Sequence, residues 1–325
     1  MDQKDSFSTG TELHVRAASR SDIGRVRKHN EDAIALCEPP DQSRLSQLGR
    51  LYLLADGAGG HAAGEVASQV AVETIAATYY DQRTSAHPVE NVPQSQGEVS
   101  HLHGLPPGLA VPVRQIQQAF LAADTRIGEL AALKREYTGM ATTCVAAVVK
   151  NAQILIAHIG DSRAYLIRPS PASLPTITCL TTDHSMVTAL LQAGVITPEQ
   201  MHSSPSRHII LRVLGGSKQD NPNPDVTTYV VQAGDYLVLC CDGLWSLLSE
   251  EQIATVVSSN SPQAACDELV RLANEAGGQD NISVVVLSFA QDQDTQKTGR
   301  MVGNRSWQHL LQAMKRSRHS RDAHG

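Results

Sequence analysis

Two apolar segments of this chain each end in an aspartate that is followed at once by a glycine. They are Leu53-Leu54-Ala55-Asp56-Gly57 and Leu239-Cys240-Cys241-Asp242-Gly243. Short apolar runs of this kind predict buried strands, and each aspartate stands where its strand would end. The glycine lets the backbone behind the aspartate approach a ligand closely. The chain is therefore expected to contain buried strands whose ends carry carboxylates.

Three further aspartates lie in loop-like segments. Asp32 ends the segment 27–32, Asp161 follows Gly160, and Asp280 follows two glycines and a glutamine. A single aspartate of this kind usually stabilises a turn or a helix end. That alternative does not explain the two strand-end Asp-Gly pairs. An all-oxygen ligand set favours magnesium or manganese over zinc, and carboxylate-rich two-metal sites are common in phosphate ester hydrolysis.

Composition limits the remaining possibilities. The 325 residues suffice for one large domain or two small ones, and the formal net charge of −6 argues against general nucleic-acid binding. The six cysteines form no Cys-x-x-Cys motif, and most of them are expected to be buried free thiols in a reducing cytoplasm. This includes Cys241, beside Asp242. The acidic, polar N-terminus is not expected to be a signal peptide, and no transmembrane segment is expected.

Periodicity predicts an antiparallel α+β fold. Two hairpins are expected, one joining 142–149 to 153–159 and one joining 226–231 to 236–241. The other expected strands are 13–18, 33–37, 51–55, 164–167, 176–180 and 282–289. The expected helices are 64–80, 113–136, 185–194, 250–258 and 262–276.

Two segments differ in composition from the rest. Residues 85–112 hold five of the fifteen prolines and no Lys or Arg, which indicates a loop insertion. The tail, 291–325, holds seven of the 27 Lys and Arg residues against three acids. Within it an apolar helical face precedes basic residues: Trp307, Leu310, Leu311 and Met314, then Lys315, Arg316, Arg318 and Arg321. The tail is either a disordered solubilising segment or one that folds on an acidic partner, an anionic membrane surface or the protein's own acidic cleft.

Six segments, taken in order over residues 12–290, resemble those of the metal-dependent serine/threonine protein phosphatases (PPM, type 2C), in particular the bacterial branch. They are 21–32, 56–68, 139–143, 160–163, 242–245 and 277–283. The resemblance implies an α-β-β-α sandwich, with two antiparallel sheets flanked by helix pairs. It also implies a phosphatase domain at 12–290 after a polar extension at 1–11, with a variable flap at 193–215 beside the cleft.

The resemblance assigns ligands for two Mn²⁺ or Mg²⁺ ions and for a third, weaker one. Asp56 would bridge the two ions, the Gly57 carbonyl would bind one of them, and Asp32 would act at the second. The first ion would be completed by Asp242 and Asp280, and the third would be held by Asp161 together with Asp242. For Asp161 a plain turn residue with Arg163 as its ion partner remains the alternative.

Two further residues are assigned by the resemblance to the reaction itself. Arg27 would bind the phosphate oxygens with its planar guanidinium, and His61 would protonate the leaving serine or threonine oxygen. Without the resemblance, Arg27 would be taken as a surface arginine and His61 as part of a glycine-rich turn. Two positions depart from the family pattern: Ala58 stands where methionine is usual, and His158 where asparagine is common.

The implied function is hydrolysis of phosphoserine and phosphothreonine esters by a metal-activated water. Phosphorylated proteins are the expected partners, among them a serine/threonine kinase and its substrates, and a monomer is expected. The alternative is a non-catalytic relative that binds phosphoproteins. Such a protein should have lost a ligand, whereas all five aspartates are present. A cysteine-based phosphatase needs an arginine six residues after its cysteine, which none of the six cysteines has.

Overall fold

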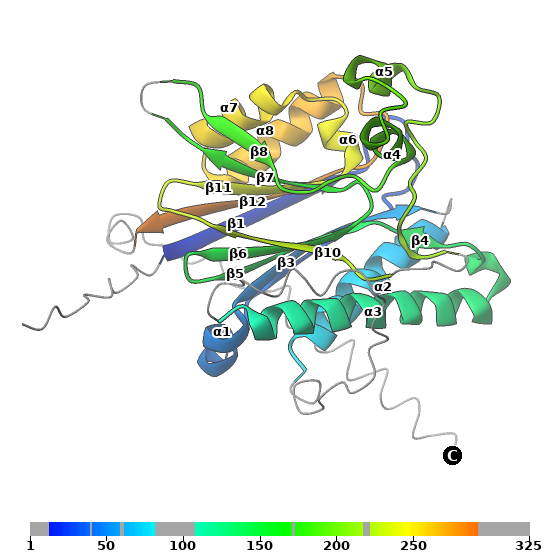
Figure 1. Cartoon of the computed structure of the whole chain (residues 1–325), viewed down its shortest axis with the longest axis horizontal. Coiled ribbons are helices and arrows are strands. Elements are labelled where there is room, and N and C mark those ends of the chain that lie inside the picture. The colour runs from blue at the N-terminus through cyan, green and yellow to red at the C-terminus, as the bar shows by residue number, and fades with distance from the viewer. Residues whose placement is uncertain are drawn as a thin grey trace, which may run out of the picture.

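Two antiparallel β-sheets lie face to face between two layers of helices (Figure 1). The structure is a computed structural model that describes residues 13–39, 41–58, 62–81, 108–170, 173–216 and 222–291. One sheet has the order β1 (Leu13–Asp22), β12 (Ile282–Gln291), β11 (Tyr236–Cys240), β7 (Arg163–Arg168) and β8 (Thr176–Cys179). This arrangement confirms the predicted α+β sandwich.

The second sheet contains the strand that ends at Asp56. Its order is β10 (Asp225–Val230), β6 (Gln153–Ile159), β5 (Cys144–Lys150), β3 (Arg50–Ala58), β4 (Ala141–Thr142) and β9 (Leu214–Gly215). A further strand, β2 (Asp32–Cys37), pairs with β3. Each sheet thus contributes one of the two Asp-Gly strand ends.

Helices cover the outer face of each sheet. The second sheet is covered by α2 (Ala62–Tyr79) and α3 (Ala110–Leu133), with α1 (Gln42–Leu48) beside them. The first is covered by α7 (Glu250–Ser259) and α8 (Pro262–Glu275), with the single turn α6 (Asp242–Trp245). The helices α4 (Met186–Gln192) and α5 (Pro198–Ser203) lie at the same end as α6 (Figure 1).

The apolar run before Asp56 is buried on both of its faces. Leu51, Leu53 and Ala55 pack in the cluster that includes α2 and α3, whereas Tyr52 and Leu54 pack in the cluster between the two sheets. Because neighbouring residues of a strand point to opposite faces, a strand between two layers must be apolar at every position. The sandwich therefore explains the continuous run.

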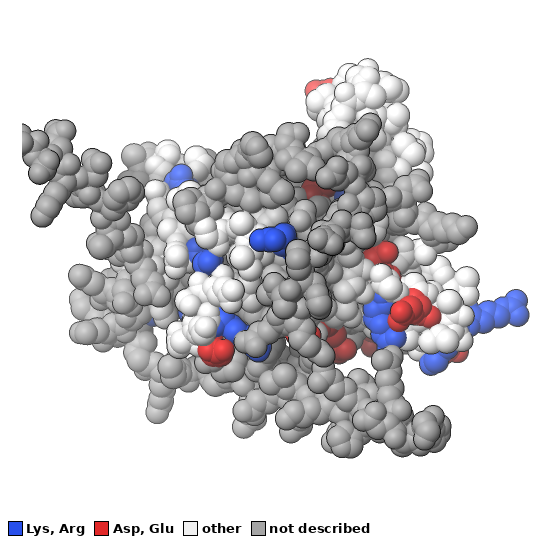
Figure 2. Space-filling model, turned by 60° about the horizontal axis from the view of Figure 1, so that its bottom comes forward, with Lys and Arg blue, Asp and Glu red and all other residues white. Residues whose placement is uncertain are grey.

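Helix ends follow from local sequence. Ser249 and Gln252 form a capping box at the start of α7, and Pro262 occupies the first turn of α8, where its missing N–H costs nothing. None of the helices in the described ranges combines the length and hydrophobicity needed to span a bilayer. Figure 2 brings the side with α1 to α3 forward, where the described Lys and Arg side chains are scattered among Asp and Glu.

The hairpin predicted between 153–159 and 142–149 is confirmed by the pairing of β5 with β6. The hairpin predicted between 226–231 and 236–241 is wrong. β10 pairs with β6 in one sheet, whereas β11 pairs with β12 and β7 in the other. β10 is partly exposed along its length and suits an edge, while β11 is almost fully buried and suits the centre of a sheet.

The sequence predicted secondary structure less accurately in segments without strong hydrophobic periodicity. α3 begins at Ala110 and buries Pro112 in its first turn, so the predicted insertion is wrong at its C-terminal end. Its residues 85–107, the extension at 1–11 and the tail beyond Gln291 lie outside the described residues. The short elements α1, α5, α6, β4 and β9 were not predicted, because each is too brief to show a period.

Candidate metal centre

Asp32 and Asp56 face each other across two strands. Asp32 begins β2 and Asp56 lies near the end of β3, and the two residues are directly paired in the antiparallel ladder. Side chains of directly paired residues project from the same face of a sheet. The ladder therefore places both carboxylates side by side. The Asp56 backbone is fixed from its other side, because its carbonyl accepts hydrogen bonds from Thr143 N at 2.9 Å and Thr142 Oγ1 at 2.8 Å.

Asp242 and Asp280 come from the other sheet. Asp242 opens α6 directly after β11, and Asp280 lies in the loop before β12. One Asp280 oxygen accepts the N–H of Asn281 at 2.8 Å, and the other forms a 2.6 Å ion pair with Arg27. Two strand ends and one loop, from both sheets, therefore converge on one cluster of carboxylates.

The glycines behind Asp56 and Asp242 are required by close packing. A Cβ atom on Gly57 would collide with the carbonyl oxygen of Gly64 in α2, and one on Gly243 would collide with that of Asn281. Backbone atoms at such contacts have little room to move. Glycine at these positions therefore lets the two strand ends approach α2 and the loop before β12.

Asp161 lies in the turn between β6 and β7, next to Asp242. Its side chain is buried, and burial, followed by the charge of Asp242, raises its pKa to about 7. The alternative in which Arg163 is its ion partner is wrong, because Arg163 binds Asp183 through two hydrogen bonds of 2.9 and 2.7 Å. Asp161 is thus one more buried carboxylate at the edge of the cluster.

Burial and mutual repulsion act on the whole cluster. Burial is the main reason that the pKa of Asp32 rises to about 7, and the charges of Asp242 and Asp280 add to it. The pKa of Asp56 is raised well above its ordinary value by burial and by the charge of Asp32. The pKa of Asp242 is also raised, again mainly by burial. A bound cation would neutralise these buried like charges and remove their mutual repulsion.

Asp32 gives the clearest test of whether a cation fits. Both of its carboxylate oxygens are shielded from solvent, and neither makes a hydrogen bond of ordinary geometry within the described part of the chain. Buried carboxylate oxygens nearly always have a partner. The carboxylates of three other aspartates lie nearby, and oxygen ligands of this kind are those that Mg²⁺ and Mn²⁺ prefer. The residues present therefore fit a divalent cation.

Asn281 is a functional residue that the sequence interpretation did not single out. Its amide nitrogen donates to the carbonyls of Ile23 and His29, and its oxygen accepts the N–H of Glu31. Glu31 in turn accepts hydrogen bonds from Gly57 N and Ser68 Oγ. These bonds hold the loop before Asp32 against β3 and α2. The only sign of this role in the sequence is that Asn281 directly follows Asp280, a predicted metal ligand.

Arg27 lies at the rim of the cluster with its side chain half exposed. The hydrogen bond to Asp280 is the first cause of its raised pKa. A charged guanidinium at the open side of a carboxylate cluster is available to an incoming anion. His61 lies outside the described residues.

Cys241 is buried beside the cluster, with its thiol within 4.8 Å of ligand atoms of Asp32 and Asp56. Its sulfur accepts the N–H of Ser283 at 3.1 Å and donates to the Asn281 carbonyl at 3.3 Å. Burial raises the pKa of this thiol well above its ordinary value, which keeps it neutral. This arrangement agrees with the expected core role. All six cysteines are free.

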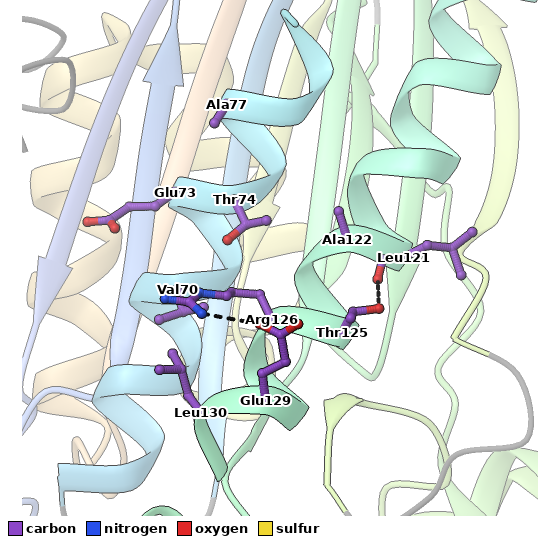
Figure 3. A pocket seen from close by; sticks show the side chains of 10 residues that line it. All are labelled: Val70, Glu73, Thr74, Ala77, Leu121, Ala122, Thr125, Arg126, Glu129 and Leu130. Carbon is purple, nitrogen blue, oxygen red and sulfur yellow. Dashed lines mark hydrogen bonds and ion pairs between the residues drawn. The ribbon is translucent and has the colours of Figure 1, made fainter. Parts of the chain in front are cut away.

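A groove of about 670 Å³ lies elsewhere, between α2 and α3 (Figure 3). Val70, Thr74 and Ala77 line one wall, while Leu121 and Leu130 line the other. Arg126 and Glu129 form a 3.2 Å ion pair at its edge. None of the clustered aspartates lines this groove.

Comparison with known proteins agrees with this geometry. Residues 25–282 match the model of a family described as protein phosphatase 2C. The chain belongs to the protein phosphatase 2C family. It is 34% identical over 274 residues to the protein phosphatase PhpP of Streptococcus pneumoniae, a match that covers 84% of this chain and 96% of PhpP. It is also 34% identical to the serine/threonine protein phosphatase PstP of Mycobacterium tuberculosis, covering 84% of this chain and 45% of PstP.

Solved structures of this family have the same fold. The crystal structure of M. tuberculosis PstP aligns with a TM-score of 0.66 at 32% identity, covering 86% of this chain and 99% of that one. The PstP catalytic domain in complex with two manganese ions aligns with a TM-score of 0.64 at 31% identity, covering 86% and 99%. As a member of the protein phosphatase 2C family, the chain is a metal-dependent serine/threonine protein phosphatase.

Proposed function

We propose that the clustered aspartates hold the divalent cations of this phosphatase, with Asp56 shared between two of them. Asp32 would hold one cation, Asp242 and Asp280 the other, and the Gly57 carbonyl would complete the set. Asp161 would hold a third, weaker one together with Asp242. The observation that carries the proposal is Asp32, whose two buried oxygens make no hydrogen bond of ordinary geometry with the described residues and lie beside like charges.

The chemistry of the reaction explains why such a cluster is needed. A phosphomonoester dianion repels an incoming nucleophile, and the bound cations screen that charge and lower the pKa of water. The chain's own residues orient the ester. Arg27, at the open rim, would exchange its ion pair with Asp280 for the phosphate oxygens. His61 would give a proton to the leaving serine or threonine oxygen.

We propose phosphorylated proteins as substrates, among them a serine/threonine kinase and the targets of that kinase. Support comes from the relatives, which are named serine/threonine phosphatases. A cytoplasmic location is proposed because all six cysteines are free. A monomer and a domain boundary near residue 290, where β12 ends at Gln291, complete the proposal.

Release of phosphate from phosphoserine and phosphothreonine peptides tests this function. Metal-stripped protein should be inactive and should regain activity with Mn²⁺ or Mg²⁺, and EDTA should abolish that activity again. A phosphoprotein that is bound but not hydrolysed, at saturating Mn²⁺, would instead favour the non-catalytic alternative.

A further inference from the structure

The helices α4 and α5 belong to one excursion of the chain that leaves the body at His184 and returns at Arg212. Its two ends are joined by hydrogen bonds, from Met186 N to the Ile209 carbonyl at 2.9 Å and from Leu211 N to the His184 carbonyl at 2.7 Å. We call residues 184–212 the α4–α5 segment, and it includes most of the flap. Because its ends are joined, anything that holds His184 holds the base of the whole segment.

His184 is bonded twice to Gly160, the residue before Asp161. The His184 N–H donates to the Gly160 carbonyl at 3.0 Å, and the Gly160 N–H donates to Nδ1 of the His184 ring at 3.0 Å. Gly160 has a φ of +103°, and a Cβ atom there would collide with Thr143. The backbone that carries Asp161 is therefore shaped by a glycine and held by one histidine.

The opposite side of the His184 ring is held by an ion pair. Because Nδ1 accepts a hydrogen bond, the ring hydrogen lies on Nε2, which donates to the Asp225 carboxylate at 3.2 Å. Arg212 binds the other oxygen of Asp225 at 2.7 Å and the Asn223 carbonyl at 2.5 Å. The hydrogen bond from His184, then those from Arg212, hold the pKa of Asp225 far below its ordinary value, so the carboxylate stays charged.

This cluster differs from a metal site, although His158, His184 and Asp225 have ligand atoms within 4.8 Å of one another. The two imidazole rings are stacked, with centroids 4.7 Å apart and planes 10° from parallel. A ring nitrogen binds a metal in the plane of its ring, so one ion cannot lie in two nearly parallel planes. The Arg212 guanidinium beside the ring already supplies a positive charge, and it and the His184 Nε2–H both donate to the Asp225 carboxylate and not to each other.

The residue before His184 reaches Asp161 by a second route. Asp183 binds Arg163, whose guanidinium lies 3.7 Å from the ring centroid of Trp245. The indole N–H of Trp245 donates to the carbonyl of Asp161 at 3.0 Å. Asp183 and His184, at the point where the α4–α5 segment begins, therefore hold the backbone on both sides of the Asp161 carboxylate.

We propose that His184 is a positioning residue for Asp161, and that the Arg212–Asp225 pair holds His184 so that the α4–α5 segment and the Asp161 carboxylate keep one relative orientation. The inference rests on the proposed role of Asp161 at the third, weaker cation. Under this proposal the affinity of that cation also depends on residues that are not among its proposed ligands. Breaking the pair should therefore weaken one binding step and spare the others.

The test uses the full-length chain with Arg212→Gln and Asp225→Asn. Arg168→Gln is the matched control, because it breaks another Arg–Asp ion pair, the two-bond pair with the buried Asp235 at the other end of β7. Mn²⁺ binding is measured by titration calorimetry, and the Mn²⁺ concentration for half-maximal hydrolysis of p-nitrophenyl phosphate is measured alongside it. Thermal unfolding shows that each variant folds. The side-chain oxygen of His184→Asn can still accept the Gly160 N–H. This variant should therefore retain more of the wild-type affinity for the weakest-bound Mn²⁺ than His184→Ala.

In both pair-breaking variants the weakest Mn²⁺ binding step should weaken about 3- to 10-fold, below the 10- to 100-fold usual for residues that bond a ligand directly. The tighter steps and the rate at saturating Mn²⁺ should stay within about twofold of wild type, and Arg168→Gln should bind like wild type. Unchanged binding in both variants, or an equal shift in the control, overturns the inference. A wild-type chain that binds only two Mn²⁺ ions also overturns it, while leaving the proposed two-metal function standing.

Discussion

Asp32 and Asp56 are directly paired residues of the β2–β3 ladder, so the register of two strands brings these carboxylates together. Residues 24 positions apart in the sequence thus share one face of a sheet. A shift of register by one residue would turn one side chain to the opposite face. Burial of the apolar residues that fix the register therefore offsets the repulsion between the carboxylates. Leu53 and Leu54 are two such residues, and both are fully buried.

The metal-free protein should be more stable at pH 5.5 than at pH 7.5. The pKa of Asp32 is raised to about 7 in the folded chain, so the folded state binds more protons than the unfolded state between the ordinary pKa, near 4, and 7. Stability is thus present at low pH and is lost as the pH rises through 7. For one such group the loss is on the order of 2 kcal/mol. Thermal unfolding in EDTA at the two pH values measures it.

The substitution Asp32→Asn provides the control for that experiment. An amide does not ionise, so the variant should show a smaller loss of stability between pH 5.5 and 7.5. Saturating Mn²⁺ should stabilise wild type more at pH 7.5 than at pH 5.5, because the carboxylates must lose their protons to bind it. A metal-free wild type that gains stability as the pH rises would contradict the assignment.

Arg27→Ala should impair substrate binding while leaving the metal ligands in place. Loss of a charge-assisted hydrogen bond predicts an increase of about 10- to 100-fold in KM for phosphomonoesters, and weaker inhibition by inorganic phosphate. The KM of Arg27→Lys should lie between those of wild type and Arg27→Ala, because lysine keeps the charge but loses the planar guanidinium. Steady-state kinetics at saturating Mn²⁺ checks this. An unchanged KM in Arg27→Ala would show that the arginine only pairs with Asp280.

His61→Ala should slow hydrolysis of phosphoserine and phosphothreonine peptides more than hydrolysis of p-nitrophenyl phosphate. An alkoxide leaving group needs a proton, whereas nitrophenolate leaves readily without one, and general acid catalysis contributes roughly 10²- to 10⁴-fold. Comparing kcat on the two substrates separates the cases. Equal losses on both substrates would argue against a general acid at this position.

Deleting residues 292–325 should leave metal-dependent hydrolysis of p-nitrophenyl phosphate unchanged, because every proposed ligand precedes Gln291. Activity on a phosphoprotein should change only if the tail docks on the substrate or on the enzyme. Replacing Trp307 and Leu310 with serine in the full chain is the matched control for the apolar face. A folded truncation that loses small-substrate activity would place the tail inside the catalytic domain.

The sequence predicted the strands best where both faces are buried. Leu51 to Ala55 and Ile282 to Phe289 are apolar at nearly every position, and each became a strand within two or three residues of its predicted ends. The carboxylates at Asp56 and Asp242 were predicted because each directly follows an apolar run of this kind in the sequence. The apolar run predicts that the strand is buried, and the Asp-Gly pair that follows it predicts where the strand reaches the cluster.

Contacts between distant segments could not be predicted in this way. The wrong pairing of 226–231 with 236–241 arose because a turn signal does not state in which sheet its two strands lie. The bonds of Asn281 to Ile23 and His29 likewise join segments about 250 residues apart. Only the packing of the two sheets brings such residues together.

Counting the Mn²⁺ ions bound per chain, together with hydrolysis of a phosphothreonine peptide, tests the central claim most directly. Metal-stripped wild type should bind two Mn²⁺ ions tightly and regain hydrolysis as they bind. Asp56→Asn, with an intact unfolding transition, should lose tight binding and at least about a hundredfold of turnover, because the proposed role of this carboxylate is to serve both ions. Full hydrolysis by the metal-stripped protein in EDTA, or wild-type turnover in Asp56→Asn, would contradict the account.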